Sequence, residues 1–283
     1  MSSVHVRDWV PPLLWRVIRQ WGGGSMSFRR SPGSWRKGLA ISSGYSQEEI
    51  LTRVVLATRA VVSGQAIYER DSVLFHEPAL PFQILAPLLR AAALNHGVLN
   101  VVDIGGALGS TFRQCRAYLG PVGKLRWYVV EQPHFVAAGN REFAGDELTF
   151  VESLPALPPM SEPCVVLASS VLQYLEKPDE LLGELRQLNA SALVVDRTPL
   201  SSAPEHRLCI QHVSSRIYPA SYPCWVLSRP RVIESLSGDW RVSAEFSCPE
   251  GSYSLGLSSF EFRGILFERR NEPPSRFRPA SVP

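Results

Sequence analysis

The chain has 283 residues, enough for one large α/β domain with additional segments. Hydrophobic residues make up 45% of it, and a mean hydropathy of −0.01 is that of an ordinary globular protein. The formal net charge is +3, but residues 1–40 carry seven basic side chains against the single acidic residue Asp8. A basic N-terminal arm on a mildly acidic body indicates a local surface role and argues against a protein built around nucleic acid.

The cysteine pattern points to a reducing compartment. The five cysteines are odd in number and form no C-x-x-C pair. His206, Cys209, His212 and Cys224 are metal-ligand types, but their spacing matches no familiar zinc module, so we expect no metal site. No apolar run approaches the ~18 residues that cross a bilayer, and no secretory signal is evident. We therefore expect a cytoplasmic protein.

Residues 1–42 are predicted to form a basic amphipathic helix and a flexible linker. Apolar side chains at helical spacing define one face of residues 8–21, namely Val10, Leu13, Leu14, Val17, Ile18 and Trp21. Arg16 and Arg19 lie off that face. Such a helix can lie in a membrane interface or pack on the domain, and periodicity does not separate the two. Glycine and serine then dominate a connector over residues 22–44.

Residues 43–97 are predicted to form a helical segment that faces the substrate or acts as a lid. Ser46 opens a helix with the character of a capping box, and a second helix is expected over residues 81–94. Between them, the run Tyr68-Glu-Arg-Asp-Ser-Val-Leu-Phe75 is richer in charge than its apolar surroundings.

The most informative stretch is Val98-Leu-Asn-Val-Val-Asp-Ile-Gly-Gly-Ala-Leu-Gly-Ser110. A short apolar run bounded by glycine is typical of a buried parallel strand. The glycines that follow allow a tight turn and a close approach of the backbone to a ligand, just before the free N–H groups of a helix start. Because Asp103 precedes the glycines, the motif resembles motif I of class I S-adenosylmethionine-dependent methyltransferases, D-x-G-x-x-x-G. The dinucleotide fingerprint G-x-G-x-x-G has a different spacing.

Strands and helices alternate after this turn. Helices are expected at 111–119, 133–143, 179–188 and 229–236, and strands at 125–130, 148–151, 164–168, 192–195, 240–246 and 260–268. This order predicts a doubly wound, mostly parallel sheet with one antiparallel C-terminal strand. Ligands of such sheets bind beyond the carboxyl ends of the strands. Residues 199–228, rich in proline and aromatic residues, are expected to form a lid insert, and residues 271–283 a disordered tail.

An acidic residue at the end of the second strand indicates an adenosyl cofactor. Glu131 lies 22 residues after Gly109, about one helix and one strand further on. At this position a carboxylate can accept hydrogen bonds from ribose hydroxyls. Dehydrogenases share the feature, so Glu131 alone does not choose between S-adenosylmethionine and NAD.

Five separated segments carry a closer resemblance. They are Tyr68-Glu-Arg-Asp-Ser-Val-Leu-Phe75, Val129-Val-Glu-Gln-Pro-His-Phe-Val136, Ser169-Ser-Val-Leu-Gln-Tyr-Leu-Glu176, Asp196-Arg-Thr-Pro199 and Ile217-Tyr-Pro-Ala-Ser-Tyr-Pro-Cys-Trp225. Over roughly residues 43–270 the chain resembles a bacterial methyltransferase family often associated with surface-polysaccharide gene sets. The resemblance implies a class I methyltransferase (Rossmann-like) domain over 98–270, with the insert at 199–228. It does not specify the methyl acceptor.

These inferences define a predicted site for S-adenosylmethionine. Cofactor-binding residues are predicted to be Asp103, Gly105, Gly106, Gly109, Glu131, Gln132, Glu152, Ser169 and Ser170. Candidates for a general base are His212, His206 and Asp196, and candidates for gripping a polar acceptor are Tyr68, Arg70, Asp71, Tyr218, Tyr222 and Trp225.

The predicted function is methyl transfer to a sugar or a lipid-linked glycan. Residues 8–21 could bring the enzyme to the inner membrane face. Two alternatives stay open: a catalytically silent Rossmann-like module in a glycan-assembly complex, and an NAD-dependent oxidoreductase, which the glycine spacing disfavours.

Overall fold

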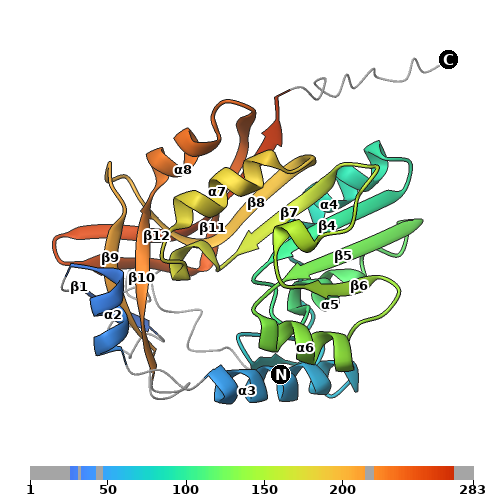
Figure 1. The fold of residues 1–283 in the computed structure, drawn as a ribbon, viewed down its shortest axis with the longest axis horizontal. Coiled ribbons are helices and arrows are strands. Elements are labelled where there is room, and N and C mark those ends of the chain that lie inside the picture. Colours follow the sequence, from blue (N-terminus) through green and yellow to red (C-terminus); the bar gives the residue numbers. More distant parts are fainter. Residues whose placement is uncertain (1–25, 31–32, 43–46, 214–219, 271–283) are drawn as a thin grey trace, which may run out of the picture. The chain divides into compact units, whose positions relative to one another are not determined.

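A computed structural model describes residues 26–30, 33–42, 47–213 and 220–270 (Figure 1). Within the described chain, two compact units can be distinguished, and each is treated separately. The smaller unit comprises Met1–Gly44, Leu208–Cys224 and Tyr253–Ser259, and the larger comprises Tyr45–Arg207, Trp225–Ser252 and Phe260–Pro283. The predicted helix at 8–21, the cap at Ser46 and the tail at 271–283 lie outside the described residues.

The larger unit is built on a parallel sheet. Its strands are β4 (Val98–Ile104), β5 (Lys124–Val130), β6 (Leu148–Val151), β7 (Cys164–Ser169) and β8 (Ala190–Ser201). They lie in the order β6-β5-β4-β7-β8, and every neighbouring pair is parallel. This order places β4 at the centre, so the carboxyl ends of β4 and β7 are adjacent where the chain order of the sheet reverses.

The sheet ends in an antiparallel strand, as the sequence predicted. Strand β12 (Ser258–Arg269) runs antiparallel to β8, and β11 (Trp240–Leu255) pairs with β12. A doubly wound parallel sheet that closes with one antiparallel C-terminal strand is the Rossmann-like fold of class I methyltransferases. The predicted fold class is therefore confirmed.

Helices cover both faces of this sheet. They are α3 (Gln47–Val62), α4 (Phe82–Leu94), α5 (Ser110–Arg116), α6 (Pro133–Glu142), α7 (Pro178–Gln187) and α8 (Arg229–Leu236), with short 3₁₀ turns η2 (Leu154–Ala156) and η3 (Leu172–Tyr174). Alternate residues of β4 belong to two separate core clusters, because successive side chains of a strand point to opposite faces of the sheet. Leu99 and Val101 join the cluster under α3, α4, α5 and α6, whereas Val102 and Ile104 join the one under α7 and α8.

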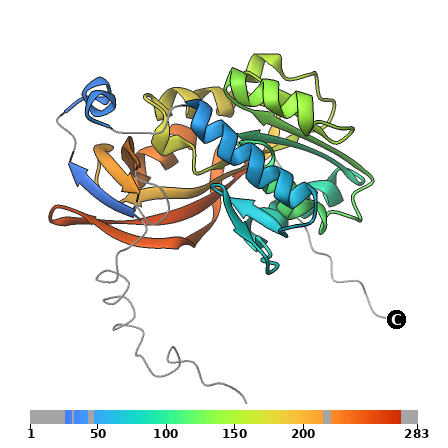
Figure 2. The same ribbon diagram turned by 90° about the horizontal axis from the view of Figure 1, so that it is seen from below.

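The charged run at 68–75 forms a hairpin, where the sequence analysis placed no strand. Strands β2 (Tyr68–Arg70) and β3 (Val73–Phe75) pair antiparallel, and Figure 2 shows them beside α3. Asp71 and Ser72 at the tip have positive φ angles of 52° and 65°. A two-residue turn of this kind matches the twist of the strands that it joins. Glycine and asparagine usually signal such a turn, and neither is present here.

Strand β8 is longer than predicted. The sequence analysis ended this strand at Val195, but it continues to Ser201, with Arg197 in the left-handed region at φ 50°. Thr198 and Leu200 pair with β12, and Leu200 also pairs with Leu227 at the end of β10 (Ala220–Ser228). These partners are distant in sequence, so local pattern did not reveal the extension.

The smaller unit contains a helix and antiparallel strands. Strand β1 (Met26–Arg30) runs antiparallel to β9 (Arg207–Val213), and helix α2 (Trp35–Ile41) is capped by the Ser34 side chain. Much of the predicted insert at 199–228 therefore consists of strands. Cys209 and Cys224 are buried in this unit, and the Cys209 thiol donates to the Cys224 carbonyl at 3.0 Å.

Candidate active site

The glycine turn lies at the carboxyl end of β4 and needs its glycines for two different reasons. Gly105 and Gly109 have φ angles of 67° and 86°, which favour glycine. A Cβ at Gly106 would come within 2.6 Å of the Asp103 carboxylate. The absence of a side chain at Gly106 therefore lets the backbone of the turn lie directly against Asp103.

Asp103 is a buried carboxylate held beneath the turn. Its side chain is 1% exposed, and the Trp127 indole N–H donates to Oδ2 at 3.1 Å. Burial raises the pKa of Asp103 to about 7, with the nearby Glu131 contributing in the same direction and the indole opposing it. A positive charge at the turn would lower this pKa again, so the site favours a cation such as an ammonium group.

Glu131 lies on the other side of the turn. It follows β5, and its carboxylate accepts a hydrogen bond from the Gln132 N–H at 2.7 Å. The Ala107 N–H within the turn also hydrogen-bonds it, while burial has the largest effect and raises its pKa. Strand pairing sets the ends of β5 and β4 side by side, with Val130 opposite Ile104. The structure thus brings Asp103 and Glu131, both predicted cofactor-binding residues, to the same turn.

The hairpin β2–β3 is hydrogen-bonded to the residue that follows the same turn. Glu69 is 5% exposed, and its carboxylate accepts hydrogen bonds from the Ser110 hydroxyl and from the Ser72 N–H. Ser110 is the first residue of α5, directly after Gly109. Burial raises the pKa of Glu69. Glu69 lies within the charged run at 68–75 but was not among the predicted site residues, because no local signal identifies its distant partner.

A second group of polar side chains lies where β7 and β8 reach the carboxyl edge. Ser169 is the register partner of Asp196, and its hydroxyl donates to Asp196 Oδ2 at 3.1 Å. The Cys248 thiol of β11 approaches Oδ1 at 3.4 Å. Burial raises the pKa of Asp196 despite these contacts. Ser170, at φ 57°, donates its N–H to the Asp196 carbonyl at 2.9 Å.

Arg197 joins this group to the hairpin. Its guanidinium donates to Glu250 Oε1 at 2.6 Å and to Asp71 Oδ2 at 2.7 Å. Burial lowers the pKa of Arg197, but the two carboxylates outweigh that effect and raise it above its usual value. The hairpin is thus tied to the β4–α5 turn at Glu69 and to β8 at Asp71. Sequence reasoning missed Glu250 entirely, because it lies within a long strand in a different part of the chain.

The three base candidates have different surroundings. Asp196 is at the carboxyl edge. His206 accepts a hydrogen bond from the Ser228 N–H at Nδ1 (2.8 Å), which leaves Nε2 to donate to Asp179 at 3.0 Å. Both ring nitrogens are therefore committed. His212 belongs to the smaller unit, where burial and the Arg29 cation lower its pKa.

The predicted acceptor residues are similarly divided. Tyr68 stacks on Phe75 with ring centroids 4.6 Å apart, and Arg70 lies over the Tyr68 ring. The Trp225 indole donates to the Leu175 carbonyl at 3.0 Å. Tyr222 belongs to the smaller unit, and Tyr218 lies outside the described residues.

Glu152, the last of the predicted cofactor residues, follows β6 and is exposed at the same edge as Glu131.

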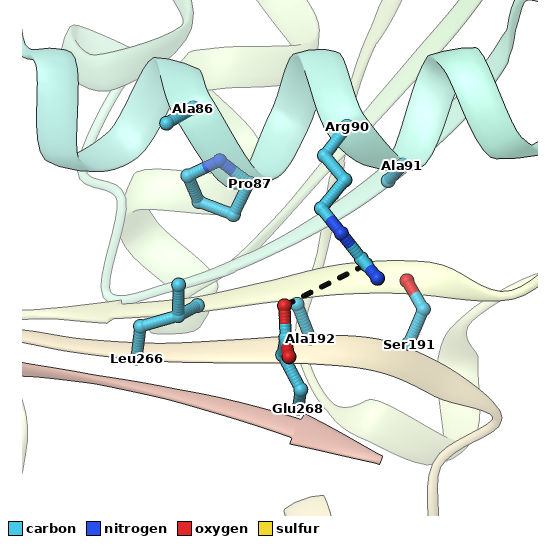
Figure 3. A pocket seen from close by; sticks show the side chains of 8 residues that line it. All are labelled: Ala86, Pro87, Arg90, Ala91, Ser191, Ala192, Leu266 and Glu268. Atoms are coloured by element: carbon cyan, nitrogen blue, oxygen red, sulfur yellow. Dashed lines mark ion pairs between the residues drawn. The ribbon is translucent and has the colours of Figure 1, made fainter. Parts of the chain in front are cut away.

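A pocket is present at the opposite edge of the sheet. It lies between α4 and the start of β8, where Arg90 pairs with Glu268 at 3.6 Å (Figure 3). Pro87, inside α4, and Leu266 line its apolar side. Parallel sheets of this kind bind ligands at their carboxyl edge, so this pocket is separate from the candidate site.

No helix among residues 26–30, 33–42, 47–213 and 220–270 is long and apolar enough to cross a membrane. In the same part of the chain, no three His, Cys, Asp or Glu side chains are grouped to hold a metal ion.

No protein-family model matches the chain, and no curated protein matches it. Several solved methyltransferase structures are similar to it. A Burkholderia thailandensis 1,6-didemethyltoxoflavin-N1-methyltransferase, with its substrate and S-adenosylhomocysteine bound, is 16% identical over 80% of this chain and 92% of its own, with a TM-score of 0.40.

Two more solved structures give comparable values. The glycopeptide N-methyltransferase MtfA, complexed with sinefungin, is 12% identical over 65% of this chain and 86% of its own, with a TM-score of 0.43. Magnesium protoporphyrin IX methyltransferase from Synechocystis, with bound S-adenosylhomocysteine, is 15% identical over 93% of this chain and 97% of its own, with a TM-score of 0.41.

Proposed function

We propose that this protein is an S-adenosylmethionine-dependent methyltransferase. The observation that carries the proposal is the glycine turn held between two acidic side chains at the carboxyl end of the central strand. Asp103 lies against Gly106 beneath the turn, and Glu131 hydrogen-bonds the turn from the neighbouring strand. A buried carboxylate suits the cofactor's ammonium group, and a carboxylate after the second strand suits a ribose diol.

The residues around the turn would bind and orient the cofactor. Asp103 would accept hydrogen bonds from the ammonium, Glu131 and Gln132 would contact the ribose, and Glu152 would lie near the adenine. Ser169 and Ser170 would line the sulfonium end. When bound, the cofactor would supply an electrophilic methyl group for in-line displacement by the acceptor, with S-adenosylhomocysteine as the leaving group. Catalysis of such a step depends mainly on alignment of the two reactants.

Asp196 is our candidate for the general base. Its carboxylate is at the carboxyl edge between Ser169 and Cys248, and its raised pKa makes it a stronger base. It would take the proton of an acceptor hydroxyl at Oδ1 or Oδ2. His206 is less suited to this role, because its two ring nitrogens are bonded to Ser228 and Asp179.

The acceptor that we propose is a sugar or a lipid-linked glycan, in the bacterial cytoplasm. The support is the resemblance of five segments to a family associated with surface-polysaccharide gene sets. In this view the amphipathic sequence at 8–21 holds the enzyme at the inner membrane face. Vesicle flotation of the full chain, compared with a variant that lacks residues 1–25, would test that contact.

Cofactor binding is tested by isothermal titration calorimetry with S-adenosylmethionine, S-adenosylhomocysteine and NAD. We expect micromolar binding of the two sulfur ligands and none of NAD. Asp103→Ala and Gly106→Ala should each weaken binding by at least about tenfold, because one removes the carboxylate and the other pushes it away.

Gly183→Ala is the matched control for Gly106→Ala. Gly183 lies on α7, and a Cβ there would meet no atom within 4 Å. Binding by this control should equal that of the wild type. If a folded wild-type protein bound neither sulfur ligand, the silent interaction module would be the better explanation. Binding of NAD alone would favour the oxidoreductase.

A further inference from the structure

Two oxygen atoms near the carboxyl edge are buried and have no hydrogen-bond partner among the described residues. They are Glu250 Oε2 and Gln173 Oε1. The other oxygen of Glu250 accepts from Arg197, and the Gln173 amide donates to the Arg197 carbonyl at 3.2 Å and to the Ser170 hydroxyl. Both unpartnered oxygens therefore belong to side chains that contact Arg197. Buried polar atoms are nearly always hydrogen-bonded, so this pair indicates a ligand that donates hydrogen bonds.

The Asp71 contact to Arg197 differs from the Glu250 contact in its exposure. The Glu250 side chain is 13% exposed and the Arg197 side chain 17%, but the Asp71 side chain is 62% exposed. Asp71 also lies at the tip of a two-residue hairpin turn, whereas Glu250 is within strand β11. Exposed ion pairs contribute little stability. Asp71 is thus the partner that a ligand could replace, while Glu250 keeps the guanidinium in place.

The charge of this group selects among possible ligands. Arg197 is the cation, and Asp71, Glu250 and Asp196 are three carboxyl groups around it. A phosphate or carboxylate would meet this excess of acidic groups, which disfavours it. A neutral polyol would instead donate to the free carboxylate oxygen and accept from the guanidinium. Paired donors and acceptors of this kind match two neighbouring hydroxyls.

We propose that Arg197 and Glu250 form a subsite for a pair of hydroxyl groups on an uncharged part of the acceptor, with Asp71 as the partner of Arg197 that the ligand replaces. Arg197 donates to one hydroxyl oxygen, Glu250 Oε2 accepts from the other hydroxyl, and Asp71 moves aside with the hairpin tip. Asp196, the next residue to Arg197, is then close to the bound sugar. The inference rests on the proposed function for the reaction, but the binding of a polyol can be measured without it.

The test is saturation-transfer NMR on the full chain with four probes: methyl α-glucoside, glucosamine, glucuronate and glucose 6-phosphate. We expect the neutral glucoside to bind best and the two anionic sugars to bind at least about tenfold more weakly. Stronger binding of either anion would overturn the proposal. Preference for glucosamine would also overturn it, since that result would assign the subsite to an ammonium group.

Substitutions at the subsite test which residues bind the glucoside. Arg197→Lys and Glu250→Gln should each reduce affinity for the glucoside about tenfold, because Lys lacks the planar, multi-donor guanidinium and Gln lacks the charged acceptor oxygen. Asp71→Asn should raise affinity, since it weakens the competing contact. If the hairpin acted only as a structural clamp, Asp71→Asn would instead lower the affinity for the glucoside. Arg186→Lys is the matched control. Arg186 is in the last turn of α7, and its guanidinium pairs with Asp239 at 2.8 Å.

Each measurement is made with and without S-adenosylhomocysteine. Glucoside binding without any binding of the sulfur ligand would overturn the methyltransferase proposal and keep the subsite. Binding of the sulfur ligand with no glucoside signal, or equal losses in Arg197→Lys and Arg186→Lys, would overturn the subsite and keep the methyltransferase.

Discussion

At the scale of single residues, the candidate site contains four carboxyl groups whose pKa is raised by burial. Asp103, Glu69, Glu131 and Asp196 all have raised pKa values, and burial is the largest cause for each. Such perturbed groups gather at functional sites more often than elsewhere. Sequence reasoning selected three of the four from their position after a strand. It did not select Glu69, which is on a hairpin and depends on a distant helix.

The pKa of Asp103 has a consequence for stability. Because this pKa is about 7 in the fold and near 3.8 in the unfolded chain, the native state holds the proton more tightly. Stability should therefore be greatest below pH 4 for this group and should fall as the pH rises from 4 through 7. The full loss of unfolding free energy from ionising Asp103 in the fold is of the order of 4 kcal/mol.

Asp103→Asn isolates this effect, because the amide stays neutral and can still accept from the Trp127 indole. In urea unfolding, the variant should gain stability relative to the wild type between pH 4 and 8. A difference that does not change with pH would contradict the assignment. Affinity for S-adenosylhomocysteine should rise with pH over the same range in the wild type, since the ionised form attracts the ammonium.

At the scale of elements, the hairpin β2–β3 is fixed by contacts at two places. Glu69 is bonded to Ser110 at the start of α5, and Asp71 is paired with Arg197 on β8. Strand β7 lies between β8 and β4, the strand that precedes α5. The hairpin therefore crosses the edge of the sheet where cofactor and acceptor would meet. Elements that admit ligands are often among the less stable parts of a fold.

Ser110→Ala should loosen this hairpin. The change leaves Glu69 buried without one of its two donors, and the loss of a hydrogen bond to a charged group costs about 1.5–3 kcal/mol. We expect amide hydrogen exchange over residues 68–75 to accelerate about tenfold or more. Ser235→Ala removes a hydroxyl bonded to its own helix and serves as the control. Equal exchange in the two variants would show that Ser110 does not hold the hairpin.

At the scale of the whole molecule, the antiparallel pair β11 and β12 completes the larger unit. Phe246 on β11 lies over Gly264 on β12, where a Cβ would come within 2.1 Å of the ring. Gly264 falls between Arg263 and Ile265, at the bulge where the register with β8 shifts. The close approach of ring and backbone requires glycine at this point.

Gly264→Ala should destabilise the protein by about 1–3 kcal/mol, as overpacking of a filled core does. Differential scanning calorimetry should show a lower Tm, and Phe246→Leu in the same chain should restore part of it. Gly145→Ala, at an open position, should leave the Tm nearly unchanged. If Phe246→Leu gave no rescue, the clash would not be the cause.

The sequence by itself determined the sheet, the glycine turn and the two acidic residues beside it. Those features depend on short-range pattern, namely apolar runs, glycines and a fixed spacing, so they can be read along the chain. Only the tertiary structure decided the hairpin, the extension of β8 past Asp196 and the Arg197–Glu250 contact. Each of these depends on pairing between segments far apart in sequence, and local propensity carries no information about such partners.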